Sequence, residues 1–442
     1  MTFKEHIETF MNKETVTQLL NSLELSPKQS FKKNLLKGRE INTLLENVEI
    51  LPLKEVNNAY YFNKGTDELG KSLEFIAGAF YIQEPAAMLA ETLLNINEND
   101  KILDMCAAPG GKTFDAIMDN HDNSILVCND INPLRAKVLS ANIEKYGFKN
   151  VICLNDDSSK YKNSFLEYFD KIILDAPCSG SGMFRKDKFA ITDWSIEKVY
   201  QCVEIQKKLL EDAYCMLKGQ GRLLYSTCSF SIQENEEVIA NFLKNHPDMK
   251  IIPIELNKKY SNTISLNGGL RLYPFQYDGE GQVMFLLEKE GYEEKGCKKI
   301  KDNNKDFKEL YSFLKSINYQ YDKKNILKIG NQFYLSPAEK IDVFKYNVIR
   351  YGLHLGYLEN SRFVPSHSLA MVHDIDKNLF FELSLAQAKE YIKGLQIKVD
   401  NASNRKGLVI ASYKGLALGW AKLVNNDLKN HLPKGLRINI QN

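Results

Sequence analysis

The sequence lacks an apolar run that could cross a membrane. No stretch approaches the roughly 18 consecutive apolar residues that a spanning helix needs. The start, Met1-Thr2-Phe3-Lys4-Glu5-His6, is charged where a secretory signal is apolar. These absences predict a protein of the cytoplasm with no membrane partner.

Cysteine pairs at metal-binding spacing are missing as well. The chain has eight cysteines, seven of them between residues 106 and 228, and no two are separated by the two residues of a C-x-x-C motif. A disulfide framework or a zinc ribbon would space its cysteines differently, and no group of histidines lies near them. We therefore expect reduced thiols and no metal.

A strong excess of one charge is absent too. The net charge is +2, and 26% of the residues are charged. Such a balance argues against an indiscriminate nucleic-acid coat but leaves room for local basic patches. With 442 residues, the chain is long enough for two to four domains, and it contains no internal repeat or low-complexity tract.

Strand-like and helix-like segments alternate between residues 71 and 290. The expected strands are Ile102–Met105, Ser124–Cys128, Val151–Leu154, Lys171–Leu174, Arg222–Tyr225 and Val283–Leu287. The expected helices are Thr113–Asn120, Pro133–Tyr146, Ser195–Leu217 and Gln233–Asn245. This alternation predicts an α/β fold with a mostly parallel, doubly wound sheet.

Three further regions flank this core. Residues 1–70 form a small N-terminal α+β region, with helical spacing in Phe3–Leu23 and a strand at Asn58–Phe62. Residues 291–310 form a linker, because eleven of the twenty are charged. Residues 311–442 form a separate C-terminal region, in which a helix at Leu383–Lys393 precedes a hairpin turn at Lys414-Gly415.

A glycine-containing loop follows the first core strand and opens a helix. It is formed by Cys106, Ala107, Ala108, Pro109, Gly110, Gly111 and Lys112. Small residues let a ligand approach the backbone, and the helix N-terminus favours a carboxylate or a phosphate. A nucleotide-hydrolysing P-loop would need a small residue where Cys106 stands, and Pro109 removes a backbone donor.

Two acidic residues follow this loop at the ends of the next strands. Asp130 lies 130 − 111 = 19 residues after Gly111, where an acid grips ribose hydroxyls in related folds. Asp157 follows the third strand, where a carboxylate can accept from an adenine amino group. Each acid alone is typical of a loop or a helix cap. Together, and in this order, they favour S-adenosylmethionine as the cofactor.

Two loops carry a cysteine directly after a strand, Asp175-Ala176-Pro177-Cys178 and Ser226-Thr227-Cys228. A helix separates the strands, so we expect parallel neighbours whose thiols face one crevice. A thiolate that adds to carbon 6 of a pyrimidine makes carbon 5 nucleophilic toward a methyl sulfonium. Asp175 would hydrogen-bond the nitrogen 3 edge. A lone cysteine at a strand end is usually a small buried side chain, but these two lie in loops rich in proline, serine or glycine and not in apolar runs, which favours a chemical role. The residues alone do not say which thiol attacks.

At these residues the chain resembles the NOL/NOP/Sun family of S-adenosylmethionine-dependent RNA cytosine-5 methyltransferases. The shared motifs run from about Gly78 to Lys289 and include Tyr81 to Pro85, the glycine loop, both cysteine loops and Glu234-Asn235-Glu236. Two segments resemble the bacterial RsmF-like branch, which modifies small-subunit ribosomal RNA and carries a PUA-like RNA-binding domain. They are Gly182 to Asp187 and Gly279 to Gln282.

The resemblance implies a role for each matching residue. Cys228 would be the nucleophile, Cys178 would assist release of the product, and Asp175 would contact the base close to the cofactor. The loop from Cys106 to Lys112 would hold the methionine part of S-adenosylmethionine. Asp130 would then bind its ribose and Asp157 its adenine. The implied fold is a Rossmann-like methyltransferase sheet between an N-terminal RNA-binding region and a C-terminal PUA-like region.

A target base must be single-stranded or flipped out before a buried thiol can reach it. Arg185 and Lys186 follow the first cysteine loop, and we expect them to clamp the flanking phosphates. Near the C-terminus, Trp420 lies among basic residues, but we interpret it as part of the core. Two other classes stay open: a DNA methyltransferase, and a non-catalytic RNA-binding factor for ribosome assembly.

Overall fold

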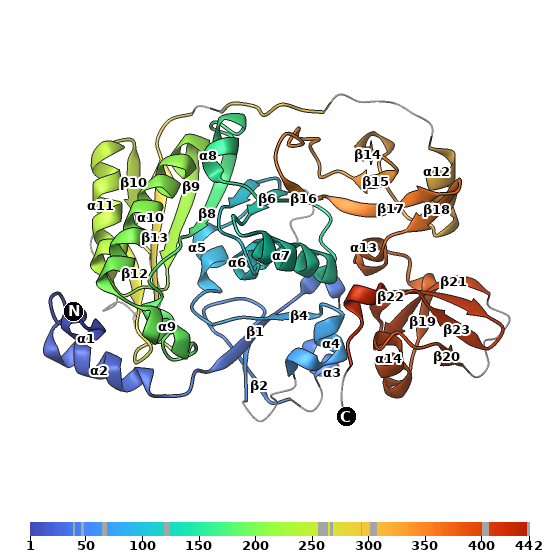
Figure 1. The fold of residues 1–442 in the computed structure, drawn as a ribbon, viewed down its shortest axis with the longest axis horizontal. Helices are drawn as coiled ribbons and strands as arrows, with labels where there is room; N and C mark the ends of the chain where they lie inside the picture. The colour runs from blue at the N-terminus through green and yellow to red at the C-terminus, as the bar shows by residue number, and fades with distance from the viewer. Residues whose placement is uncertain are drawn as a thin grey trace.

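The computed structural model describes residues 1–38, 40–45, 48–63, 69–118, 124–254, 264–265, 268–292, 294–300, 307–399 and 406–439. Four β-sheets organise these residues. In Figure 1 the large central sheet lies on the left, the N-terminal sheet lies below it, and the two C-terminal sheets lie on the right. In the described residues, no helix combines the length and the apolar character that crossing a membrane requires.

The central sheet has the order β11-β12-β13-β9-β8-β5-β6-β7-β16, and β10 pairs with β13. Its strands are β5 Lys101–Asp104, β6 Ile125–Asn129, β7 Val151–Leu154, β8 Phe169–Asp175, β9 Leu217–Thr227, β10 Met249–Ile252, β11 Ile264–Ser265, β12 Gly269–Leu272, β13 Gln282–Lys289 and β16 Val348–Tyr351. From β7 to β9 the neighbours are parallel, whereas β13 runs antiparallel to β9. This confirms the predicted alternation, and the parallel pairing of β8 with β9.

Helices cover both faces of this sheet. They are α5 Leu89–Leu94, α6 Gly111–Met118, α7 Pro133–Tyr146, α8 Ser158–Tyr161, α10 Ile196–Met216 and α11 Glu236–Asn245. Neighbouring side chains of β5 point to opposite faces. Ile102 packs in one core with Phe114 of α6, and Leu103 packs in the other with Leu210 of α10. The sheet is therefore doubly wound, and its strand order reverses at β5.

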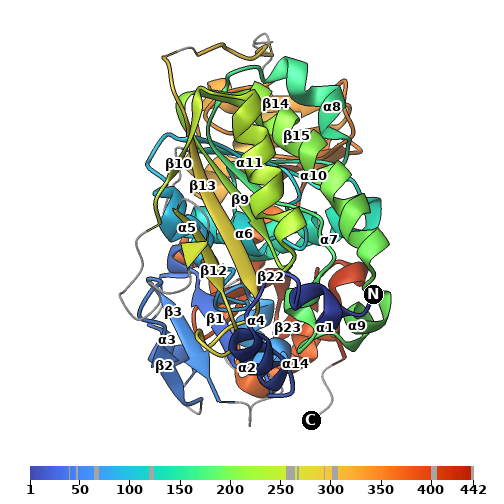
Figure 2. The same cartoon turned by 90° about the vertical axis from the view of Figure 1, so that its left-hand side faces the viewer.

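The N-terminal region combines helices with a small antiparallel sheet. Its elements are α1 Phe3–Ile7, α2 Lys13–Leu23, β1 Gln29–Lys33, α3 Ile41–Leu44, β2 Ile50–Pro52, β3 Ala59–Phe62, α4 Leu73–Ile76 and β4 Phe80–Ile82. The strand expected at Asn58–Phe62 is β3. β4 lies beyond residue 70 and still pairs with β1. Helices α1 and α2 pack on Phe230, so they reach the second cysteine loop, and α9 (Lys188–Asp193) lies beside them (Figure 2).

The C-terminal half contains two more sheets. Their elements are α12 Lys308–Ser316, β14 Ile326–Ile329, β15 Gln332–Leu335, β17 Leu353–Glu359, β18 Arg362–Pro365, α13 His367–Met371, β19 Phe380–Glu382, α14 Leu385–Ile392, β20 Ile397–Lys398, β21 Gly407–Tyr413, β22 Leu416–Val424 and β23 Asp427–Asn430. The hairpin at Lys414-Gly415 is present, with the positive φ angles that its two-residue turn requires. Trp420 is buried, as expected.

This half is not independent of the central sheet. Strand β16 lies within residues 311–442, yet it pairs with β7 and forms the edge of the central sheet. The charged segment before it also contacts the core surface, because Lys295 pairs with Glu167 at 2.8 Å and Lys298 pairs with Asp342 at 2.6 Å. Sequence periodicity gives no sign of such antiparallel pairing between distant segments.

Candidate active site

The two predicted cysteine loops meet at the carboxyl ends of β8 and β9. Asp175, the last residue of β8, lies in register with Ser226 of β9. Both strands therefore end at the same level, and each continues into a cysteine. The sulfur atoms of Cys178 and Cys228 are 3.1 Å apart, and both cysteines are free and half-buried. The structure thus brings together the two thiols that the sequence singled out.

The thiol of Cys178 is perturbed by its neighbour and by burial. The hydrogen bond with Cys228 and the burial of the site raise the pKa of Cys178 well above that of an ordinary thiol. A cysteine with a raised pKa keeps its proton at neutral pH. Cys178 is therefore placed to donate its S–H toward the sulfur of Cys228, and a negative charge on that sulfur would strengthen the contact.

Asp175 is held on two sides. Ser226 Oγ donates to one carboxylate oxygen at 2.7 Å, and Lys112 Nζ lies 2.8 Å from the other. Burial alone would lower the pKa of Lys112, but the carboxylate of Asp175 outweighs burial and the pKa is raised. Lys112 therefore stays charged and joins the glycine loop to the cysteine loop. The sequence places Lys112 in the cofactor loop but gives no sign of its contact with Asp175.

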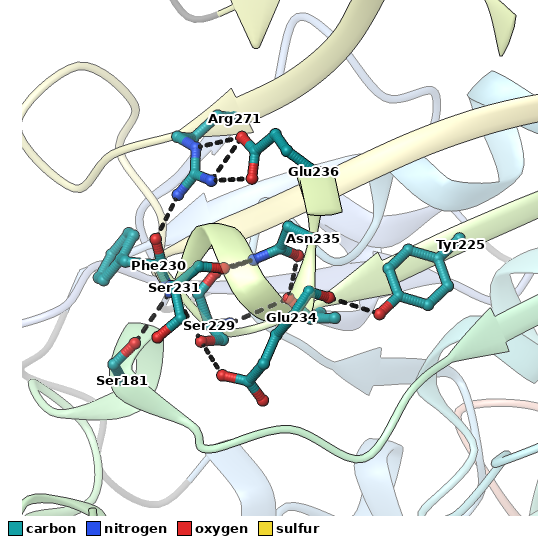
Figure 3. Close-up of polar contacts among 10 residues, drawn as sticks. Ser181, Tyr225, Ser229, Phe230, Ser231, Glu234, Asn235, Glu236 and Arg271 are labelled. Atoms are coloured by element: carbon teal, nitrogen blue, oxygen red, sulfur yellow. Dashed lines mark hydrogen bonds and ion pairs between the residues drawn. The ribbon is translucent and has the colours of Figure 1, made fainter. Parts of the chain in front are cut away.

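A buried glutamate fastens both cysteine loops to the same point. Glu234 accepts hydrogen bonds from the backbone N–H of Ser179 at 2.7 Å and from the Ser179 hydroxyl at 2.6 Å. It also accepts from the hydroxyl of Ser229 (Figure 3). Ser179 follows Cys178 and Ser229 follows Cys228. One carboxylate thus sets the distance between the two loops, and burial raises its pKa.

The neighbours of Glu234 extend this network. Asn235 accepts from Thr227 Oγ1 at 2.7 Å and donates to the carbonyl of Ser229 at 3.0 Å and to that of Ser231 at 2.7 Å. Figure 3 shows Glu236 facing Arg271, which donates to the carbonyl of Phe230 at 2.7 Å. The family resemblance includes Glu234-Asn235-Glu236 but implies no role for these three residues. The signal available in the sequence was the run of three consecutive polar residues, Glu234-Asn235-Glu236, shortly after the second cysteine loop.

The glycine loop lies between β5 and α6, at the point where the strand order reverses. Open α/β sheets bind their ligands at such points. Gly110 has φ +115°, and a Cβ there would come within 2.5 Å of the Phe114 ring. A Cβ on Gly111 would come within 2.9 Å of the Gln83 side chain. The space around Gly110 and Gly111 therefore admits no side chain. Without side chains there, a ligand can approach the backbone closely.

Other parts of the loop are held from behind. Asn142 of α7 donates to the carbonyl of Pro109 at 3.0 Å, and Arg135 donates to the carbonyl of Ala108. Burial raises the pKa of the Cys106 thiol, so it stays protonated. Burial also raises the pKa of Asp104, the last residue of β5, to about 7.

The two predicted ribose and adenine acids differ in their surroundings. Asp130 is buried; one oxygen accepts from the backbone of Asn132, while the other lies 3.4 Å from Arg135 and accepts no hydrogen bond within the described residues. Asp157 is exposed and caps α8, accepting from the N–H of Ser159 at 2.9 Å and from its hydroxyl at 2.7 Å. The sequence left a helix cap as an alternative role for each acid. Asp157 is such a cap, at the N-terminus of α8.

Arg185 does not lie where the sequence placed it. Its side chain is only 6% exposed and faces Glu280 at 3.2 Å, with a second bond to the carbonyl of Gly279 at 2.6 Å. The expectation that Arg185 clamps an RNA phosphate is therefore wrong: the guanidinium fastens the first cysteine loop to the loop before β13. Lys186, the next residue, is exposed and stays available for that role.

Solved structures share the fold of the central domain. A methyltransferase homologue from Pyrococcus horikoshii is 26% identical, with a TM-score of 0.54 over 62% of this chain and 91% of that one. NSun6 from the same organism is 20% identical, with a TM-score of 0.57 over 65% of this chain and 97% of that one. The fold is that of a Rossmann-like methyltransferase of the Sun/NOP type.

Family models cover most of the chain. Residues 91–287 match "16S rRNA methyltransferase RsmB/F", and residues 1–85 match its RsmF N-terminal domain. Residues 312–372 match the first C-terminal domain of RsmF rRNA methyltransferase, and residues 378–438 match the RsmF PUA domain.

Curated relatives agree with these matches. The "Ribosomal RNA small subunit methyltransferase F" of Shewanella woodyi is 34% identical over 84% of this chain and 81% of its own length. That of Shewanella piezotolerans is 30% identical over 94% and 90%. The chain belongs to the RsmB/F family of 16S rRNA methyltransferases.

Proposed function

We propose that this methyltransferase forms 5-methylcytosine in small-subunit ribosomal RNA, with S-adenosylmethionine as the methyl donor and Cys228 as a covalent nucleophile. The observation that carries the proposal is the pair of thiols 3.1 Å apart, at the strand end that also presents Asp175. The names of the relatives support the RNA substrate. The glycine loop at the reversal point of the sheet supports the cofactor.

The residues of the site fit a covalent route. The Cys228 thiol loses its proton and its sulfur bonds to carbon 6 of cytosine, while nitrogen 3, at the edge that we assign to Asp175, takes up a proton. The double bond shifts from carbons 5 and 6 to carbons 4 and 5, so that carbon 5 becomes nucleophilic. After carbon 5 has gained a methyl group, a base removes its remaining hydrogen as a proton. The bond between carbon 6 and sulfur then breaks and restores the aromatic ring. Cys178, which keeps its proton, assists the departure of the thiolate.

The residues around the glycine loop fit S-adenosylmethionine at three places. The backbone from Cys106 to Gly111 would lie along the methionine part, at the N-terminus of α6. Asp130 offers a buried carboxylate oxygen that accepts no hydrogen bond within the described residues, as a ribose hydroxyl requires. Ile131, which is 66% exposed beside Asp130, offers an apolar surface for adenine next to Asp157. When bound, the cofactor supplies an electrophilic methyl group.

The test uses the full-length protein with small ribosomal subunits from a strain that lacks its gene. After incubation with S-adenosylmethionine, bisulfite sequencing of the 16S rRNA should reveal cytosines that resist deamination. A methyl group at any other position of the base, or equal activity on DNA of the same sequence, would contradict the proposal. Calorimetry that detected no cofactor binding would favour the non-catalytic assembly factor instead.

A further inference from the structure

A pocket of about 370 Å³ is lined by tyrosines of the first C-terminal domain, but a second pocket lies much closer to the chemistry. It has a volume of about 330 Å³ and lies between the N-terminal sheet and the catalytic domain. The residues that line it include Lys28, Gln29, Phe62, Gln83, Lys186 and Glu280.

The walls of this pocket adjoin the catalytic centre on two sides. Gln83 lies against Gly111 of the glycine loop. Glu280 precedes Gly281, whose N–H donates to the carbonyl of Gly182 at 3.2 Å, and Gly182 in turn donates to the carbonyl of Cys228 at 2.6 Å. One wall thus touches the cofactor loop, and the opposite wall is linked to the nucleophile loop by backbone hydrogen bonds.

The pocket is built from fixed parts. Glu84 accepts from the N–H groups of Ala86 and Ala87 at 2.8 Å and from that of Glu280 at 2.6 Å. Glu280 itself holds the buried Arg185. The two carboxylates of the lining are therefore occupied by the protein. They join the segment after β4 to the loop before β13, and these contacts within the protein hold the walls of the pocket apart.

The remaining lining groups suit a nucleotide. Gln29 and Gln83 provide amides, and the Oε1 atom of Gln83 is buried and accepts no hydrogen bond within the described part of the chain. Phe62 provides an apolar ring. Lys186 is exposed at the rim, and Lys28 pairs there with Asp278, each side chain more than half exposed. Such surface ion pairs are weak, so a phosphate can compete for Lys28.

We propose that this pocket binds an unpaired nucleotide next to the target cytosine, with the base among Gln29, Gln83 and Phe62 and the phosphate at Lys28 and Lys186. The inference rests on the proposed function, because an RNA whose target base is flipped out must also place its neighbours. Single-stranded bases are read by hydrogen bonds to their edges and by contact with aromatic rings. The pocket offers both, beside the nucleophile.

Steady-state kinetics on small ribosomal subunits from the deletion strain tests the proposal. For Gln29→Leu we expect the KM for subunits to rise about tenfold, as the loss of ~1.4 kcal/mol of binding predicts. For Lys186→Met we expect a similar rise, and the salt dependence of binding should fall by about one phosphate contact. In both variants kcat and the calorimetric affinity for S-adenosylmethionine should stay within about twofold of the unmodified protein.

Lys208→Met is the matched control, because Lys208 is an exposed lysine on α10 outside the pocket. It should leave the KM and the salt dependence unchanged. Unchanged values for Gln29→Leu and Lys186→Met on active protein would overturn the nucleotide pocket while leaving the proposed function intact. An unmodified protein that methylates no cytosine would contradict the proposed function itself. A fall in melting temperature without a change in KM would show a merely structural role.

Discussion

At the scale of single residues, the proposed mechanism gives Cys178 and Cys228, whose sulfur atoms are in contact, separable roles. Cys228→Ala removes the atom that bonds to carbon 6, so methyl transfer to RNA should fall at least about 1,000-fold. Transfer of a labelled methyl group to small subunits measures this. A Cys228→Ala protein that kept its activity would refute the assignment of the nucleophile.

Cys178→Ala should behave differently, because it leaves the attacking sulfur in place and removes the neighbour that helps it leave. Covalent protein–RNA complex should accumulate and appear as a slowly migrating band on a denaturing gel. The double variant that also carries Cys228→Ala should show no such band. Absence of the band from the single variant would contradict the role of Cys178 in product release.

Glu234 is a positioning residue, because it is fully buried and its carboxylate accepts hydrogen bonds from the residues that follow Cys178 and Cys228. Glu234→Gln replaces one accepting oxygen with a donor that faces the donors of Ser179 and Ser229. We expect kcat to fall about 10- to 100-fold. The free energy of unfolding should fall by about 1–3 kcal/mol.

Glu237→Gln is the control for this prediction, since Glu237 lies three residues further along the chain and is exposed in the first turn of α11. It should change neither quantity. A positioning role also predicts that Glu234→Gln leaves the KM for the cofactor nearly unchanged, because the glycine loop is held by other contacts. Equal losses of kcat in Glu234→Gln and Glu237→Gln would contradict the positioning role of Glu234.

At the scale of elements, the glycine loop depends on a backbone conformation at Gly110 that a residue with a side chain rarely adopts. Gly110→Ala would force a Cβ into the Phe114 ring at φ +115°. Such a conformation is open mainly to glycine. The loop must shift, and we expect the calorimetric affinity for S-adenosylmethionine to fall at least about tenfold. Gly296→Ala has open space around its Cβ and should bind the cofactor normally.

The elements also show how far the sequence alone could lead. The helix Pro133–Tyr146 was predicted with its observed bounds, because a proline at its first position and a glycine after its last are local signals. The cysteine loops were predicted for the same reason, since parallel neighbours end at one edge of the sheet. Strand β16 and the place of β4 were missed, because their pairing partners are chosen by the tertiary fold.

Arg185 illustrates the same limit at the site. An arginine in a loop after a catalytic cysteine suggests a phosphate contact, but its partner Glu280 lies 95 residues further along the chain. No residue close to Arg185 in the sequence indicates that it forms this ion pair. Asp157 is the opposite case: its cap is local, and Ser159 two residues later was a signal available for it.

At the scale of the whole molecule, one lysine joins three parts of the chain. Lys37 of the N-terminal region donates to the carbonyl of Met371 in α13 at 2.7 Å, and it lies close to Gly147 at the end of α7. Burial, helped by the charge of Lys377, lowers the pKa of Lys37 to about 7. The N-terminal, catalytic and C-terminal regions therefore meet around an ammonium that is only partly charged at neutral pH.

This arrangement makes the docking of the three regions depend on pH. The pKa of Lys37 is about 7 in the folded protein and near its ordinary value of 10.5 in the unfolded chain. Between these values the folded protein binds fewer protons than the unfolded chain, so the free energy of unfolding should rise with pH. Its slope is at most about 1.4 kcal/mol per pH unit. Below pH 7 both states are protonated, and this contribution no longer changes.

Lys37→Met isolates the effect, because methionine keeps much of the length of the side chain and does not titrate. Urea unfolding at pH 7, 8 and 9 measures the free energy of unfolding of both proteins. The value for the unmodified protein minus that for Lys37→Met should increase by about 1 kcal/mol per pH unit. Lys208→Met, on the exposed face of α10, should show no such shift. Parallel stability curves for Lys37→Met and the unmodified protein would contradict the lowered pKa of Lys37 in the folded protein.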